Sequence, residues 1–232
     1  MDWRQVIAGL SDWKIWGFSM AQIGVTVMLY GYSTFLPSII RALGYSGIHT
    51  QLLTIPCYAC GAIVYCVTAY WSDRLKQRGI FAFAGCLVSS TRYAILLGTP
   101  NYGAGLQYAG CIIVAIGLYV SVGVPISWMP NNLPSPYKRA AGNGLMFTTS
   151  NCAGVISSYI CLSKDAPRYT MGHAIVLAFV LSSGIMFAGM TVYLRSENRK
   201  RDRGEREHVL EGKSDSEIAA LADNHPWYRY LY

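Results

Sequence analysis

Six long apolar runs, separated by short charged connections, constrain this chain more than any other feature of its sequence. Each run is long enough to cross the hydrocarbon core of a bilayer as a helix, which takes about 20 apolar residues. None of the runs contains Asp or Glu, and Arg92 is the one Lys or Arg inside any of them. The predicted spans are residues 15–37, 51–71, 79–99, 106–129, 140–161 and 169–194. The sequence therefore predicts an all-α membrane protein with six transmembrane helices.

Composition supports a bilayer environment over a soluble fold. Hydrophobic residues make up 53% of the chain and charged residues only 13%, about half the usual charged share. The net charge of +7 comes from residues between the runs and in the tail, so there is no continuous basic face for nucleic acid. The 7 cysteines all fall inside apolar runs, where cysteine acts as a small hydrophobe. We therefore expect lipid as a partner, no nucleic acid, no catalytic residue, no metal and no cofactor.

The distribution of Lys and Arg predicts the orientation, because cytoplasmic loops carry the excess of positive charge. One side of the predicted bundle receives most of the basic residues, namely Arg4, Lys14, Arg74, Lys76, Arg78, Lys138, Arg139 and those of the tail at 195–232. The other side receives only Arg41, Lys164 and Arg168. Residues 1–14 and the tail are therefore predicted to be cytoplasmic.

Polar side chains recur at helical spacing in four of the six runs. In the run 51–71 they fall at Thr54, Tyr58, Tyr65 and Thr68, which places them on one helix face. The runs 15–37 and 140–161 show similar stripes, and the run 106–129 a weaker one, whereas the other two runs show none.

Hydrogen-bonding side chains inside a span should face protein or water. The four striped helices are therefore predicted to share a polar interior, with the helices at 79–99 and 169–194 peripheral. The candidate cavity-lining residues are Gln22, Tyr30, Tyr58, Tyr65, Asn143 and Asn151. The alternative is that small and hydroxyl residues only allow close helix packing. Arg92, near the outer end of its run, is expected to extend outward to the interface.

The connection between the second and third runs carries a recognisable motif. It reads Ala69-Tyr-Trp-Ser-Asp73-Arg74-Leu-Lys76-Gln-Arg78-Gly and resembles the cytoplasmic GxxxDRxGRR-like signature of the major facilitator superfamily, although Ala69 and Lys76 replace two of its glycines. The resemblance implies a gating role for Asp73, Arg74 and Arg78, as a carboxylate near a helix end paired with loop arginines.

Further segments resemble a narrower group, the fungal anion:cation symporters related to allantoate, nicotinate and pantothenate permeases. They are Tyr30-Gly-Tyr-Ser-Thr-Phe-Leu-Pro, Gln51-Leu-Leu-Thr-Ile-Pro, Tyr137-Lys-Arg, Asp165-Ala-Pro-Arg-Tyr and the terminal His225-Pro-Trp-Tyr-Arg-Tyr. The resemblance implies a twelve-helix plasma-membrane transporter that carries a small organic anion, with protons, by alternating access. This chain would be its C-terminal six-helix half, a truncated product without the N-terminal half, with residues 1–14 as the end of the central cytoplasmic loop.

Three alternatives stay open. The chain could be a six-helix carrier that pairs with itself, or an inactive membrane fragment. A remote third alternative is an intramembrane serine protease that uses Ser121 or Ser127 with His173, although no GxSG-like turn surrounds either serine.

Overall fold

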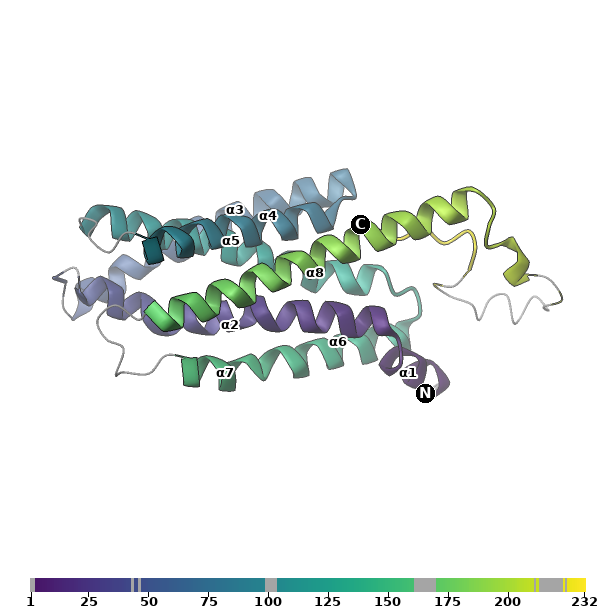
Figure 1. The fold of residues 1–232 in the computed structure, drawn as a ribbon, viewed down its shortest axis with the longest axis horizontal. Helices are drawn as coiled ribbons and strands as arrows, with labels where there is room; N and C mark the ends of the chain where they lie inside the picture. Colours follow the sequence, from purple (N-terminus) through teal and green to yellow (C-terminus); the bar gives the residue numbers. More distant parts are fainter. Residues whose placement is uncertain are drawn as a thin grey trace.

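The computed structural model describes residues 3–42, 44–45, 47–98, 104–160, 170–210, 212, 223 and 225–232. These residues form long, roughly parallel and antiparallel helices, with no strand among them (Figure 1). The helices are α1 (Trp3–Leu10), α2 (Trp13–Ala42), α3 (Ile48–Leu75), α4 (Arg78–Gly98), α5 (Ala104–Asn131), α6 (Pro136–Asn151), α7 (Ala153–Ile160) and α8 (Thr170–Asp202), followed by the 3-10 helix η2 (Glu207–Leu210). The all-α prediction is confirmed.

Four of the described helices, α2, α3, α5 and α8, are long and apolar enough to cross a membrane. Helix α4 covers the predicted span 79–99, and the pair α6 and α7 covers 140–160. Crossing by these shorter helices remains a prediction. Residues 161–169, which hold Lys164, Arg168 and the Asp165 motif, lie outside the described residues, as does most of the tail between 211 and 222.

The predicted span 140–161 is not one helix, because a turn at Cys152 separates α6 from α7. Helix α6 starts in a standard way: Ser135 caps it by accepting a hydrogen bond from the Lys138 amide, and Pro136 occupies its first turn. Near its end, Thr149 and Asn151 donate side-chain hydrogen bonds to carbonyls three or four residues back. Such bonds compete with the helical pattern and favour a break at this point.

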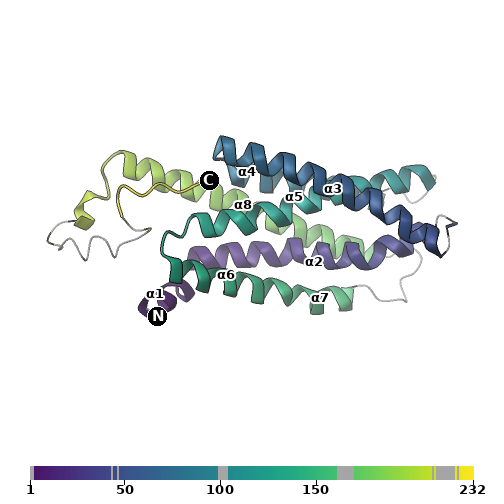
Figure 2. The same cartoon turned by 180° about the vertical axis from the view of Figure 1, so that it is seen from behind.

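The helices are arranged in two layers. Figure 2 shows α3, α5, α2 and α6 side by side on the near face, with α8 behind them. Helix α4 packs mainly on α5 and α8, and α8 packs also on α2. In the structure α4 and α8 form the second layer, and a polar interior shared by the other four predicted helices stays a prediction.

Close packing between the layers depends on small residues. At the α4–α5 crossing an added Cβ at Gly117 would lie 2.7 Å from the Gly85 carbonyl oxygen and from the Ser89 amide nitrogen. Small residues at helix contacts let backbones approach closely, which strengthens van der Waals packing in a membrane. Towards one end, the rings of Phe18, Trp128 and Phe187 join α2, α5 and α8, with centroids 4.7 and 6.3 Å from that of Trp128.

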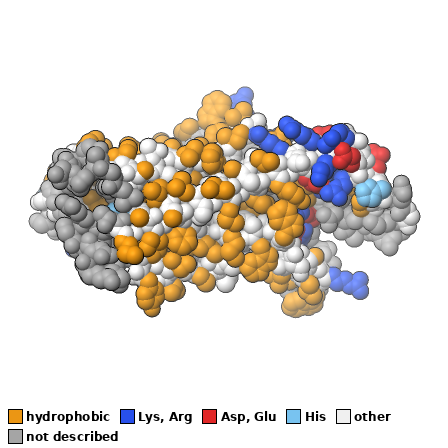
Figure 3. Space-filling view, viewed as in Figure 1, with side chains coloured by type: hydrophobic (Ala, Val, Ile, Leu, Met, Phe, Trp, Pro, Cys, Tyr) orange, Lys and Arg blue, Asp and Glu red, His pale blue; other side chains and the backbone are white. Residues whose placement is uncertain are grey.

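One end of the bundle collects most of the described charges, and we call it the charged end. It contains α1, the α3–α4 and α5–α6 turns, the end of α8 and the terminal residues 223 and 225–232. Figure 3 shows blue and red side chains concentrated there, while orange and white side chains cover the middle of the molecule.

Candidate functional site

The predicted cavity-lining residues fall into two groups in the structure. Tyr30, Tyr58, Tyr65 and Asn143 are half-buried, and Asn151 is exposed. Gln22, in contrast, is only 2% exposed and lies in the bundle, where its amide donates to the Val122 carbonyl of α5 at 3.2 Å. Ser19 and Thr26, the neighbouring polar residues on the same face of α2, are buried as well, so this part of the helix packs against its neighbours.

One predicted pair is brought together directly. The Tyr30 hydroxyl on α2 donates to Asn151 Oδ1 on α6 at 2.8 Å, and the Asn151 amide donates to the Phe147 carbonyl at 2.7 Å. The Tyr30 ring also lies 3.5 Å from where a Cβ on Gly154 would stand. The face shared by α2, α6 and α7 therefore carries a polar pair that remains partly accessible.

Two amide oxygens on the same helices lack partners. Gln22 Oε1 and Asn143 Oδ1 are buried and accept no hydrogen bond from any described residue. A buried acceptor left unpaired costs about 1–3 kcal/mol, so both atoms are candidate partners for water or a ligand. On α3, the ring of Tyr65 packs against Gly123 of α5, and the ring of Tyr58 meets that of Tyr32 edge-on at 6.2 Å.

Arg92 does not extend outward as expected. Arg92 is only 8% exposed. Its side chain lies against α5, where a Cβ added to Gly110 would stand 1.7 Å from Arg92 Nε. The glycine makes the space that the guanidinium fills, so Arg92 is held between two helices of this chain.

The serine protease arrangement does not form. The Ser121 hydroxyl donates to the Leu118 carbonyl and that of Ser127 to the Val124 carbonyl, each within its own helix. His173 on α8 instead lies beside the ring of Tyr93, with centroids 5.8 Å apart. The serines are therefore helix-bonded hydroxyls without a base beside them.

The α3–α4 turn contains an ion pair between Asp73 and Arg78, two of the residues predicted to act there. Asp73 lies in the last turn of α3, where a carboxylate is unfavourable because the helix dipole is negative there. Arg78, at the start of α4, compensates by donating Nη2 to Asp73 Oδ1 at 2.5 Å. Arg74 is not part of this pair, since it donates to the Tyr70 hydroxyl at 3.2 Å. Between them, Lys76 closes α3 in the left-handed conformation with φ 54°.

A second cluster of charges, at the charged end, was not predicted. Asp223 bridges α2 and α6: its Oδ2 accepts from Lys14 Nζ at 2.6 Å and its Oδ1 from Lys138 Nζ at 2.9 Å. Asp12 also contacts Lys138, at 2.6 Å. Burial alone would raise the pKa of Asp223, but attraction from Lys14 and hydrogen bonds from Lys14 and Lys138 hold that pKa below its ordinary value. Asp223 is therefore an ionised carboxylate that neutralises two helix ends.

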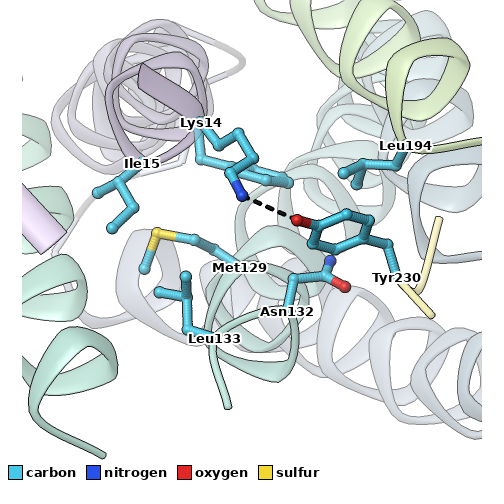
Figure 4. A pocket seen from close by; sticks show the side chains of 8 residues that line it. Lys14, Ile15, Met129, Asn132, Leu133, Leu194 and Tyr230 are labelled. Carbon is cyan, nitrogen blue, oxygen red and sulfur yellow. Dashed lines mark hydrogen bonds between the residues drawn. The ribbon is translucent and has the colours of Figure 1, made fainter. Parts of the chain in front are cut away.

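Tyr230 completes this cluster. Figure 4 shows the Lys14 ammonium pointing at the Tyr230 hydroxyl, to which it donates at 2.9 Å, beside Asn132 and Leu194. The guanidinium of Arg201 lies 4.5 Å from the centre of the Tyr230 ring. The basic residues that flank the apolar runs were the sequence feature that could have indicated this cluster. Nothing in the sequence indicated which tail residue would bind them.

Comparison with known proteins connects this chain to transporters. It is 34% identical over 228 residues to an uncharacterized transporter of Schizosaccharomyces pombe, covering 98% of this chain and 45% of that protein. It is 33% identical over 232 residues to the high-affinity nicotinic acid transporter of Saccharomyces cerevisiae, covering 100% of this chain and 43% of that protein.

A major facilitator-type transporter of Emericella nidulans is 28% identical over 225 residues. The chain therefore spans somewhat less than half the length of these curated relatives. No protein-family profile matches the chain. The relatives named above are all transporters, which agrees with the expectation that the chain is not an enzyme.

Proposed function

Because the chain belongs to the family of major facilitator-type transporters, we propose that it forms one of two walls around the path of a small organic anion. Its long apolar helices make it an integral membrane protein, and it matches somewhat less than half of each relative. Transporters of this kind move a solute by rocking two halves around a site near the middle of the membrane. We propose that this chain corresponds to the C-terminal half of a transporter in the plasma membrane, and that its charged end faces the cytoplasm.

The observation that carries the proposal is that the helices are buried to very different extents by the rest of the chain. Only 11% of the apolar stretch of α3 is buried, against 56% for α5. Helix α3 lies on the same face as α2, α5 and α6, and the accessible pair Tyr30–Asn151 joins α2 to α6 on this face. A face with polar side chains is a poor surface for lipid. We therefore propose that a second six-helix unit, and not lipid, packs against it.

The substrate class follows from the nicotinic acid transporter and from the side chains available. In the described middle parts of α2, α3, α5 and α6 there is no Lys or Arg. Hydroxyl and amide donors such as Tyr58, Tyr65 and Asn143 can bind a carboxylate by hydrogen bonds. The compensating positive charge and the proton that we propose to accompany the anion would then come from the second unit. Asp73 and Arg78 would gate the cytoplasmic side.

Uptake of radiolabelled nicotinate tests the proposal in yeast that lack their own nicotinate permease. Two proteins are compared: this chain alone, and this chain joined to the N-terminal half of the S. cerevisiae nicotinic acid transporter. We expect uptake with the joined protein only, stimulated by external acid and abolished by a protonophore. Uptake by the chain alone would support the self-pairing carrier. Absence of uptake of nicotinate, allantoate and pantothenate by a joined protein that reaches the plasma membrane would contradict the proposal.

A further inference from the structure

The described residues of the terminal segment, 223 and 225–232, bind across the charged end through their backbone as well as their side chains. The Asn132 side chain, at the end of α5, accepts from the Leu231 amide at 2.7 Å and donates to the Leu231 carbonyl at 2.9 Å. The Asn198 side chain on α8 accepts from the Tyr230 amide at 2.9 Å and donates to the Tyr230 carbonyl at 2.8 Å. Two buried amides therefore bind the backbone of two successive residues, as a neighbouring strand would.

Side chains fix the position of the segment along this site. Asp223 fits between Lys14 of α2 and Lys138 of α6, and Arg201 of α8 donates to the Asp223 carbonyl at 3.0 Å. Trp128 of α5 donates its indole N–H to the Leu231 carbonyl at 2.8 Å. The segment thus contacts α2, α5, α6 and α8 at once, through charges and amides that match its own.

We propose that residues 223–232 are a releasable strap, which holds the charged ends of α2 and α6 together while it is bound and lets them separate when it leaves. This goes beyond the proposed transport function and does not depend on the identity of the substrate. The strap would act as an internal regulator, because the end that it ties is the one that we assign to the cytoplasmic side.

The charges explain why the strap and the helix spacing are coupled. With the strap bound, Lys14 and Lys138 face the two carboxylates Asp12 and Asp223. Without it, two ammonium groups share Asp12 alone. Cations with too few partners repel one another and regain stability by moving into water. Release of the strap therefore favours hydrated, separated ends of α2 and α6.

The chemistry of the interface explains why the strap can be released. Most of its described contacts are ion pairs and hydrogen bonds, whose attraction is largely offset by the cost of removing the groups from water. The apolar part of the interface is the buried ring of Tyr230 with Tyr228 and Tyr232 packed beside the core, whereas Trp227 is 75% exposed. Bound and released forms therefore differ by less free energy than they would with a wholly apolar anchor.

Hydrogen–deuterium exchange of the full chain in lipid nanodiscs tests the strap. In Asp223→Asn we expect the protection factors of the Tyr230 and Leu231 amides to fall at least about tenfold. The start of α2 and the α5–α6 turn should lose protection in the same variant. The matched control is Glu205→Gln, which removes the charge of an exposed ion pair with Arg203 and should leave all three regions unchanged.

A second experiment keeps the test decisive if the substitution disturbs folding. The chain is truncated before Asp223, and a synthetic peptide of residues 223–232 is then added. The peptide should restore protection of the α5–α6 turn, and the same peptide with Asn in place of Asp223 should fail to do so. Two results would overturn the proposal: unchanged protection of the segment in Asp223→Asn, or loss of that protection with no change in α2 and the α5–α6 turn.

Discussion

The membrane face and the charged end of this protein use polar groups in opposite ways. On the face made by α2, α3, α5 and α6, Tyr30, Tyr58, Tyr65 and Asn143 are half-buried, and Asn143 Oδ1 accepts no hydrogen bond from any described residue. At the charged end, Asp223 and Lys138 are buried, Lys14 is half-buried, and several short contacts join the three. The difference indicates that the face is prepared to receive something else, whereas the carboxylate of Asp223 is already satisfied within the chain.

If that contrast is right, the largest loss of stability should follow from breaking the charged end. Lys138→Met removes a buried ammonium group that contacts both Asp12 and Asp223. Loss of the only partner of a buried charge costs about 3–5 kcal/mol, and the loss here should be smaller because Lys14 still contacts Asp223. We expect a clear drop in the unfolding temperature in nanodiscs. Lys200→Met, at an exposed position of α8, is the control and should unfold like the wild type.

Acid should weaken the charged end without any mutation. The pKa of Asp223 is lowered in the folded protein, where it faces Lys14, Lys138, Asp12, Arg201 and Tyr230. A group with a lowered pKa stabilises the fold above its unfolded value, about 3.9 for Asp, and loses that contribution as pH falls through the folded value.

Protection of the Tyr230 and Leu231 amides, corrected for the intrinsic effect of pH on exchange, should therefore be constant from pH 7 to about 5 and fall below about pH 4. Asp223→Asn has no carboxylate to titrate at this position and should show no such step. A step of equal size in that variant would assign the transition to other carboxylates.

A smaller loss is expected in the membrane part, where packing and not charge joins the layers. Gly117→Ala places a methyl group 2.7 Å from the backbone of α4, and overpacking of this kind costs about 1–3 kcal/mol. Gly144→Ala, on α6, meets no atom within 4 Å and serves as the control. A stable Gly117→Ala protein would show that α4 and α5 can move apart more easily than their contact implies.

The two regions also differ in how much of them the sequence predicts. Bilayer physics sets the length and polarity of each span, so most of each apolar run falls within described helices. The break between α6 and α7 was missed, because it depends on local competition by Thr149 and Asn151.

The charged end was beyond prediction for a different reason. Lys14 and Asp223 are 209 residues apart in the sequence, and any of the eight acidic tail residues would have satisfied a charge-pairing argument. The choice is made by three-dimensional complementarity, in which Asn132 and Asn198 bind the backbone beside Tyr230. The burial of Gln22 and Arg92 depends in the same way on which faces α5 presents.

The smallest effect is expected where the tail meets α8 in the open. Arg229 donates to Asp202 at 2.8 Å, with side chains 42% and 61% exposed, and such surface pairs contribute at most about 1 kcal/mol. Asp202→Asn makes the same chemical change as Asp223→Asn within the same interface, so it isolates burial as the variable. Amide protection of Tyr230 and Leu231 should stay within about threefold of the wild type. A loss as large as that in Asp223→Asn would mean that the tail is attracted by net charge alone, and that the buried contacts at Lys14 and Lys138 do not decide where it binds.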